Sequence, residues 1–345
     1  MLSQLHPRLG HGDHQRWGIL VRSERDATLT AARNVMRLLL IIVGCFLASS
    51  CGHDPAALPD VATVPDVAAY RDSVASWHAA RVEGLKAADG WLNLAGLYWL
   101  KEGSNTFGSG SDQDLVLTVG DSAAHVGEFV LREGRVTVNV APGVEVKAMG
   151  RAVDQLLLND DESGDPTILT HRSLAFFAIK RMDRIGIRLR DYEHPAVAAF
   201  PGIETYPVET AWRVAAELKP YPEPRRVAVA TVVEGLGWDP LAPGIVEFEL
   251  DGERLSLEVF ASGEDFFILF ADATNAVETY PAGRFLYAER VNADGLTVLD
   301  FNKAYNPPCA FNEFATCPLP SRRNHLEIAI PAGEKFSEAL HAPAI

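Results

Sequence analysis

The sequence lacks the motifs by which several enzyme classes are recognised. It contains no Gly-x-x-x-x-Gly-Lys phosphate-binding loop, no Gly-x-Ser-x-Gly nucleophile elbow and no dinucleotide fingerprint. Its 10 histidines and 4 cysteines are scattered, and none forms a His-Glu-x-x-His or paired Cys-x-x-Cys pattern. We therefore expect no metal site and no cofactor.

Basic residues are scarce beyond the first 50 positions. The whole chain has 31 basic and 46 acidic residues; the first 50 positions hold six and three of these, so the remaining 295 hold 25 and 43. Nucleic-acid affinity depends mainly on Lys and Arg side chains that neutralise phosphates. The net charge of −18 beyond position 50 therefore argues against a nucleic-acid partner.

No apolar run is long enough for a stable transmembrane helix. Leu38–Ala48 holds eleven uncharged residues, whereas a span needs about 20. Arg33 and Arg37 precede this run and small residues follow it, an arrangement typical of a secretory signal peptide. We interpret residues 1–50 as an upstream segment and a signal peptide, with Met36 as an alternative start.

The segment Ala48-Ser-Ser-Cys51 resembles the lipobox of bacterial lipoproteins, in which cleavage before the cysteine leaves it with a lipid anchor. Cys45 is the alternative lipidation site, and an uncleaved anchor or simple secretion is the alternative outcome. Residues 51–65, rich in proline and small residues, would then form a tether. The resemblance implies a lipid-anchored cell-envelope protein with the membrane as its partner, at the outer membrane or the periplasmic face of a two-membrane cell.

One amphipathic helix is expected after the tether. Asp66 can cap its first turn, and apolar residues then recur at spacings near three and four. These apolar positions are Val67, Tyr70, Val74, Trp77 and Leu85. The next apolar stretch, Trp91–Leu100, is expected to pack inside the protein.

Apolar and polar residues alternate through most of the remaining chain, which predicts half-buried β-strands. The alternating segments are 136–140, 144–146, 185–189, 227–231, 246–250 and 255–259, and continuous apolar runs at 174–179 and 266–270 suit central strands. Prolines between residues 195 and 225 indicate a seam. We predict a mostly β protein with two packed β-sandwich or barrel-like subdomains preceded by one amphipathic helix. The first subdomain, with the helix, is 66–195, and the second is 196–345.

Several segments resemble the family known as domain of unknown function 1684. They are Gly90–Leu100, Thr279–Tyr287, Leu299–Phe311, Phe314–Pro320 and Ala332–Lys335, and the likeness extends over about residues 70–337. Asn312 stands where that family usually has Thr. The resemblance implies membership of a family of uncharacterised bacterial proteins and supplies no activity.

Residues 94–190 resemble forkhead-associated domains, which bind phosphothreonine. The likeness lies in Gly103–Ser109, Asp114–Leu117 and Ser122–His125. Ser109 and Ala123 stand where those domains usually have the arginines that hold the phosphate. The resemblance implies a β fold, and without the arginines it gives little support to phosphopeptide binding.

Polar residues concentrate in the C-terminal family motif, and we take them as the candidate ligand site. They are Asp272, Thr274, Tyr280, Arg284, Asp300, Asn302, Tyr305 and Asn306. Arg284 can clamp a carboxylate or sulfate, and Asp300 can act as a base. Asn302 and Asn306 can orient a ligand. The alternative is structural, with Arg284 paired to Asp300 or Asp272 and the asparagines capping turns.

Three functions follow from this cluster. The first is a non-catalytic envelope protein that binds a small anion, glycan or peptide near Arg284. The second is an acid–base hydrolase that uses Asp300, Tyr280 and Arg284. The third is a structural scaffold without a ligand, in which the C-terminal motif only locks the fold.

Cys309 and Cys317 flank a proline-rich loop, so a disulfide can form between them in an oxidising compartment. As a nucleophile, Cys309 would instead depend on His325 as its base. Four tryptophans are expected in the core, although they could line a sugar or peptide groove. They are Trp91, Trp99, Trp212 and Trp238.

Overall fold

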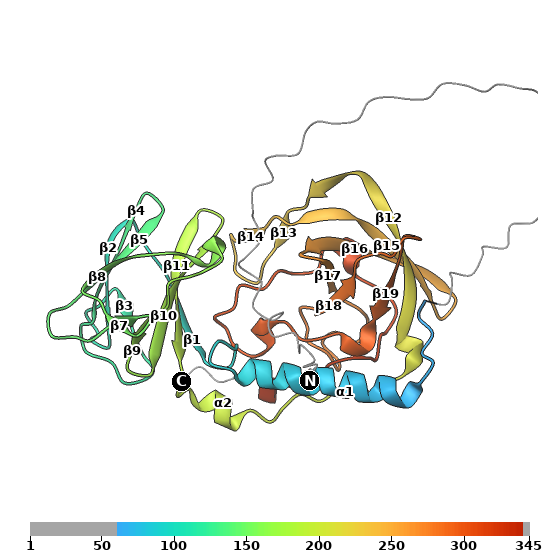
Figure 1. Cartoon of the computed structure of the whole chain (residues 1–345), viewed down its shortest axis with the longest axis horizontal. Coiled ribbons are helices and arrows are strands. Elements are labelled where there is room, and N and C mark those ends of the chain that lie inside the picture. Colours follow the sequence, from blue (N-terminus) through green and yellow to red (C-terminus); the bar gives the residue numbers. More distant parts are fainter. Residues whose placement is uncertain (1–60, 341–345) are drawn as a thin grey trace, which may run out of the picture.

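The computed structural model describes residues 61–340, which fold into two β units with one long helix along the lower edge of the view in Figure 1. The N-terminal β unit comprises residues 94–191 and the C-terminal β unit residues 213–340. Several predicted features lie outside the described residues: the signal peptide, the start at Met36, the lipidation sites Cys51 and Cys45, and most of the tether.

The N-terminal β unit consists of two sheets packed face to face. Their strand orders are β1-β11-β10-β9-β6-β7 and β3-β2-β4-β5-β8. Alternation along the strands places Phe107 and Phe129 of one sheet and Phe176 of the other in a shared core. The Phe107 ring stacks on Phe129 with 4.2 Å between centroids and meets Phe176 at 5.4 Å. The strands are β1 (Leu94–Trp99), β2 (Gly103–Gly108), β3 (Leu115–Val116), β4 (Gly127–Arg132), β5 (Arg135–Val140), β6 (Lys147–Ala148), β7 (Arg151–Ala152), β8 (Gln155–Leu158), β9 (Leu169–His171), β10 (Leu174–Arg181) and β11 (Arg184–Asp191).

The C-terminal β unit is a six-stranded, nearly closed barrel. Its strand order is β18-β17-β16-β15-β12-β19, and the two end strands β18 and β19 lie next to each other. Phe301 fills the interior, where its ring lies 5.8 Å from Phe248 and 5.5 Å from Phe270. A small hairpin, β13-β14, lies outside the barrel. The strands are β12 (Arg213–Arg226), β13 (Val229–Ala230), β14 (Gly237–Trp238), β15 (Leu241–Leu250), β16 (Glu253–Ser262), β17 (Asp265–Phe270), β18 (Arg284–Glu289) and β19 (Leu296–Asp300).

Strand β12 takes up part of the predicted proline-rich seam. It pairs with β19 only from Arg213 to Glu217, so Pro220 and the two prolines after it lie where that side of β12 has no partner strand. A residue without an N–H group is tolerated at such an edge. The connection between the units is therefore residues 192–212, which include the short helix α2 (Pro195–Ala199).

Helix α1 (Val67–Lys86) packs on the C-terminal β unit. Asp66 caps it by accepting a hydrogen bond from the backbone N–H of Ala69 at 3.0 Å. Val74 and Leu85 are buried on its inner face, as the apolar spacing predicts, and Arg81 is buried beside them. The sequence division grouped this helix with the β unit that follows it in the chain. Its long-range hydrogen bonds instead reach the C-terminal unit and, through Arg71, the connection between the units.

The structure confirms a mostly β protein with one long helix before two β units. Residues 144–146 are an exception among the predicted strands, because they form an irregular segment ahead of β6. No helix within residues 61–340 is long and apolar enough to cross a membrane. Short 3-10 helices complete the described fold: η1 (Asp161–Ser163), η2 (Thr210–Trp212), η3 (Phe301–Lys303), η4 (Pro308–Ala310), η5 (Arg322–Asn324) and η6 (Glu338–Leu340).

Candidate functional site

The first predicted site residue, Arg284, opens strand β18 and forms a buried ion pair. Its Nη2 lies 2.6 Å from Oδ2 of Asp272, and both side chains are 0% exposed. Nη2 also donates to the carbonyl of Ile330 at 2.9 Å, and Nη1 donates to the carbonyl of Ala332. Arg284 therefore ties the barrel wall to the C-terminal segment.

Asp272 is as fully engaged as its partner. Its Oδ1 accepts hydrogen bonds from the N–H and hydroxyl of Thr274, at 2.8 and 2.6 Å, and from the N–H of Ile330 at 3.2 Å. This buried carboxylate is fully occupied by donors of the protein and is closed to solvent. The arrangement matches the structural alternative for Arg284 rather than a ligand clamp.

Asp300 and Asn302 belong to a second network, at the start of helix α1. Asp300 accepts hydrogen bonds from the Tyr70 hydroxyl at 2.7 Å and from Asn302 Nδ2 at 3.2 Å. Asn302 also pairs with the backbone of Glu209, accepting from its N–H at 3.1 Å and donating to its carbonyl at 2.8 Å. Burial raises the pKa of Tyr70 far above its usual range, and the hydrogen bond to the carboxylate of Asp300 raises it further. This network holds the helix and the inter-unit connection on the barrel.

Asn306 and Tyr305 belong to a third network, under the middle of the helix. Arg81 donates to Glu334 Oε1 at 2.8 Å and to the carbonyl of Asn306 at 2.7 Å. Its guanidinium also lies 4.4 Å from the ring of Tyr305, close enough for a cation–π contact. Burial raises the pKa of Tyr305 well above its ordinary value. The helix is thus fastened to the family motif through a buried charge.

Tyr280 lies apart from these charges. It is half-buried, and its hydroxyl donates to the carbonyl of Cys309 at 3.2 Å. Within residues 61–340, no hydrogen bond or ion pair joins Tyr280 to Asp300 or either of them to Arg284. The structure therefore does not bring together the three residues of the predicted acid–base cluster.

Cys309 and Cys317 are joined by a disulfide, which closes a loop that reaches the N-terminal β unit. Asn312 in this loop donates to the carbonyl of Trp91 at 3.0 Å. The hydroxyl of Thr316 accepts a hydrogen bond from Nε of Arg181, on strand β10, at 3.3 Å. Thr316 thus holds the loop on the N-terminal unit, and Asn312, the departure from the family pattern, holds it on the segment that leads into β1.

A guanidinium that the sequence analysis missed lies on the face of β11 turned towards this loop. Arg188 occupies the central strand of the group β1-β11-β10, where it pairs with Leu97 on one side and Phe177 on the other. It is 4% exposed, yet its Nε and Nη2 have no hydrogen-bond partner. Its guanidinium carbon Cζ lies 5.5 Å from the centre of the Trp91 ring.

The charges around Arg188 make its lack of a partner more costly. Burial, reinforced by the neighbouring Arg181, lowers the pKa of Arg188 to about 9. The carboxylate that favours its charged form is Asp161, which is already bound to Arg181 at 2.7 Å. The guanidinium therefore offers two donors in a site that lacks a free carboxylate.

The alternation of β11 could have revealed this residue. Ile185, Ile187 and Leu189 point into the core of the N-terminal unit, so Arg188 and its neighbour Arg190 must lie on the opposite face. Arginines opposite a core face are ordinarily solvated, but the continuous apolar run 174–179 on the neighbouring strand indicates that this face is covered too. The alternation predicts this strand from its core face alone.

Two of the other buried polar atoms without a partner belong to side chains whose remaining polar atoms are bonded. Arg284 lacks a partner only at Nε, and Asn306 lacks one at Oδ1 while its Nδ2 donates to the carbonyl of Lys335 at 2.8 Å. Ser321 has a single unpaired hydroxyl. Arg188 is distinguished by two unpaired nitrogens on one side chain.

The loops that resemble forkhead-associated domains bind each other instead of presenting a phosphate site. Ser109 donates to the carbonyl of Ala123 from its N–H at 2.9 Å and to the carbonyl of Ser122 from its hydroxyl at 3.1 Å. Ser109 and Ala123 occupy the two positions at which those domains usually have the arginines that hold the phosphate. These loops offer a phosphate no guanidinium.

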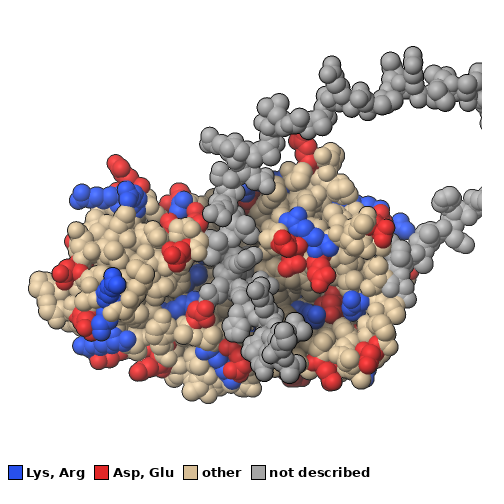
Figure 2. Space-filling model, in the orientation of Figure 1, with Lys and Arg blue, Asp and Glu red and all other residues tan. Residues whose placement is uncertain are grey.

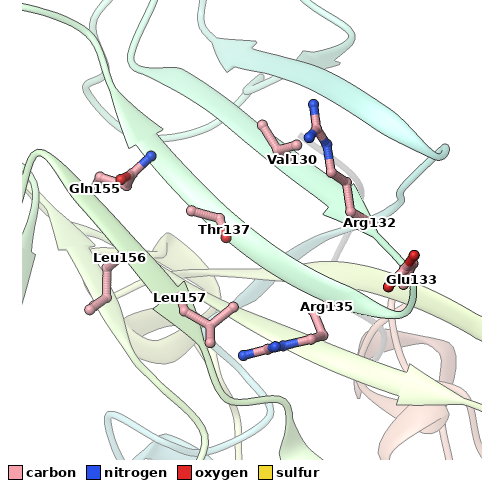
Figure 3. Close-up of a pocket in the computed structure, with 8 residues that line it drawn as sticks. All are labelled: Val130, Arg132, Glu133, Arg135, Thr137, Gln155, Leu156 and Leu157. Carbon is pink, nitrogen blue, oxygen red and sulfur yellow. The ribbon is translucent and has the colours of Figure 1, made fainter.

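A shallow hollow of about 570 Å³ lies on the outer face of strands β4, β5 and β8 (Figure 3). It is lined by Val130, Arg132, Glu133, Arg135, Thr137, Gln155, Leu156 and Leu157. None of the buried unpaired polar atoms of the described chain belongs to it. On the face in Figure 2, charges of both signs are interspersed over both units, so this face presents no broad single-sign patch.

The remaining predictions concern metal ligands and the burial of four tryptophans. No group of three His, Cys, Asp or Glu side chains in residues 61–340 could hold a metal ion. The four tryptophans are half-buried rather than fully buried. Trp91 and Trp238 pack against an aromatic cluster on the outer face of the barrel, and Trp99 lies under Arg184 at 4.1 Å.

Comparisons with known proteins indicate a family without indicating an activity. Residues 198–335 match the family model described as Protein of unknown function (DUF1684). The solution NMR structure of an uncharacterized protein from Haloarcula marismortui is 30% identical over 41% of this chain and 80% of that chain, with a TM-score of 0.35. Mycobacterium tuberculosis EmbR, solved in complex with a low affinity phosphopeptide, is 14% identical over 37% of this chain and 32% of that chain, with a TM-score of 0.18. These TM-scores are too low for a statement about function, and no curated protein matches the sequence.

Proposed function

The chain belongs to the DUF1684 family through residues 198–335, and from this premise we propose that it is a non-catalytic cell-envelope protein that binds a small anion between its two β units. The proposed site is Arg188 on β11, facing Trp91 and the disulfide-closed loop. This site replaces Arg284 as the anion-binding residue of the first predicted function, because every contact of Arg284 is internal.

The observation that carries the proposal is the unpaired, buried guanidinium of Arg188. The side chain is 4% exposed and both Nε and Nη2 lack a partner. Removing a charged group from water without a partner costs several kcal/mol. Arg81 and Arg284, the other fully buried arginines of the described chain, are both paired with carboxylates. A bound anion would give Arg188 the negatively charged partner that Arg81 and Arg284 already have.

The surroundings of Arg188 favour binding over acid–base catalysis. Asp161, the nearest carboxylate that affects it, is held by Arg181 and by the N–H of Lys180 at 2.9 Å. General acid–base catalysis needs a titratable group within hydrogen-bond reach of the substrate and free to exchange a proton. The hydrolase alternative also gains no support from Asp300, which is bonded to Tyr70 and Asn302.

A structural role for the C-terminal motif is a second function that a specific observation favours. The motif supplies both partners of the Arg284–Asp272 pair and the carboxylate that binds Arg81. These side chains are inaccessible to a ligand, and each crosslinks segments far apart in the sequence. Locking the fold and presenting an anion site on the facing unit are compatible roles.

The lipid anchor is the part of the proposal that rests on sequence alone. Cys51 follows a segment resembling a lipobox, and anchoring there would place the described units in the cell envelope. Replacement of Cys51 by Ala should move the full-length protein from the membrane fraction to the soluble fraction. The same shift with Cys45→Ala and not with Cys51→Ala would assign the anchor to Cys45.

Anion binding is tested by calorimetric titration of the full-length protein in detergent with sodium acetate, phosphate and chloride at constant ionic strength. At least one anion should bind saturably to the parent protein and fail to bind Arg188→Met. Arg184→Met is the matched control, because Arg184 lies on the same face of the same strand and its loss removes the same charge. Equal binding by the parent and Arg188→Met would refute the proposal.

A further inference from the structure

We infer that the anion bound by Arg188 is a carboxylate attached to an apolar body, which deepens the proposed function and rests on it. Two features of the site point to this class of ligand. The first is the position of the two unpaired nitrogens on the guanidinium. The second is the surroundings of Arg188, where the neighbouring arginines already have partners and the other side chains are aromatic or aliphatic.

The unpaired nitrogens, Nε and Nη2, lie on the same edge of the guanidinium plane. Their N–H bonds are nearly parallel, so the edge presents two donors side by side. The two oxygens of one carboxylate match this spacing and can accept both hydrogen bonds at once. A spherical anion such as chloride has a single acceptor centre and cannot match both parallel N–H donors in this way.

The occupancy of the neighbouring arginines argues against a dianion. Arg181 is bound to Asp161, to the carbonyl of Lys180 and to the Thr316 hydroxyl. Arg190 donates to Asn93 Oδ1 at 3.0 Å and to a backbone carbonyl. One free guanidinium edge therefore remains. It can satisfy a singly charged carboxylate, whereas a phosphate would retain excess charge and unmatched oxygens in a buried place.

The rest of the site favours an apolar ligand body. The ring of Trp91 lies 5.5 Å from the guanidinium carbon of Arg188. The backbone carbonyl of Trp91 accepts a hydrogen bond from Asn312, which holds this residue in place. Phe177, which pairs with Arg188 across the sheet, is 7% exposed, and Ile179 further along the same face is fully buried. Aromatic and aliphatic surface beside a charged fork is the usual composition of a site for a small organic acid. We therefore expect a flat or aliphatic monocarboxylate to bind more tightly than acetate.

The test compares benzoate, acetate, benzamide and phosphate in calorimetric titrations of the full-length protein, the conservative variant Arg188→Lys and the Arg188→Met variant. Benzoate should bind the parent saturably, and at least about tenfold more tightly than acetate, phosphate or the uncharged benzamide. Arg188→Lys keeps the charge but loses the fork, so its affinity for benzoate should fall about tenfold or more. Retained folding of each variant is checked by thermal unfolding.

The outcomes separate this inference from the function on which it rests. Phosphate binding as tight as benzoate binding, with both lost in Arg188→Met, would overturn the carboxylate assignment and leave anion binding intact. Benzoate binding that is unchanged in Arg188→Lys would overturn the bidentate geometry. Binding of none of the anions would overturn both proposals.

Discussion

Arg81 of helix α1 and Glu334 near the end of the described chain, 253 positions apart, form an ion pair with 2.8 Å between Nε and Oε1. The two side chains are 5% and 0% exposed. The other carboxylate oxygen of Glu334 accepts a hydrogen bond from the N–H of Asn306 at 2.7 Å. The pair therefore joins the first helix, the family motif and the C-terminal segment at one buried point.

Breaking this pair from one side should strongly destabilise the protein. Arg81→Met leaves the Glu334 carboxylate buried without its cation, which costs about 3 to 5 kcal/mol. For a chain of this size that corresponds to a fall of about 6 °C or more in the thermal unfolding midpoint. The control is Lys86→Met, since Lys86 forms only an exposed pair with Glu83 at 4.0 Å. A midpoint shift in Arg81→Met no larger than in the control would contradict this account.

The Arg284–Asp272 pair should behave as a structural lock. Arg284→Lys cannot reproduce the donors to Asp272 and to the carbonyls of Ile330 and Ala332. The free energy of unfolding should fall by about 3 kcal/mol or more. The urea concentration at the midpoint should fall in proportion, and the dependence of the unfolding free energy on urea concentration should stay unchanged. Arg290→Lys is the control, because Arg290 makes an exposed contact with the carbonyl of Gly263. Full stability of Arg284→Lys would favour a ligand-binding role instead.

The stability of the helix contact should depend on pH through His78. Its Nε2 donates to the carbonyl of Asn302 at 2.9 Å, and burial lowers the pKa of His78 below its ordinary value of 6.5. Below pH 6.5 the unfolded chain therefore takes up a proton that the folded chain refuses, and stability falls as the pH falls. Unfolding free energies at about pH 7 and about pH 5 should differ less in His78→Gln than in the parent. An identical pH dependence in both proteins would remove His78 from this account.

Reduction of the Cys309–Cys317 disulfide should weaken both the fold and the anion site. The loop that it closes carries Asn312, which holds Trp91, and Thr316, which holds Arg181. Closing a loop this short contributes about 2 to 3 kcal/mol in the chain-entropy model. The double replacement of Cys309 and Cys317 by Ser should lower the thermal midpoint and reduce the affinity for benzoate. Unchanged benzoate affinity in that variant would show that the loop does not order the site.

The sequence predicted the parts of the fold that depend on local patterns. Period-two alternation identified β5, β11, β15 and β16, because the side-chain direction along a strand is a property of the strand itself. The helix and its cap at Asp66 were predictable for the same reason. The irregular segment 144–146 was mistaken for a strand because two valines two positions apart satisfy the same pattern.

Partner choice was not predictable. The alternatives for Arg284 included Asp272, and nothing in the sequence decided between Asp272 and Asp300, since both lie near it in the chain. The pairing of Arg81 with Glu334 depends on how the helix docks on the barrel, which no local pattern encodes. Arg188 was missed because arginines on one face of a strand are usually solvated.

The central claim, that Arg188 is kept unpaired for a ligand, is tested most directly by thermal unfolding of full-length Arg188→Met in the absence of added anions. Removing a buried charge that has no partner should leave the midpoint unchanged or raise it, as is common when a functional residue is replaced by one that packs better. Arg184→Met serves as the control for the loss of one positive charge from the same strand. A fall of about 6 °C or more in Arg188→Met alone would contradict the claim, because it would show that Arg188 stabilises the ligand-free fold.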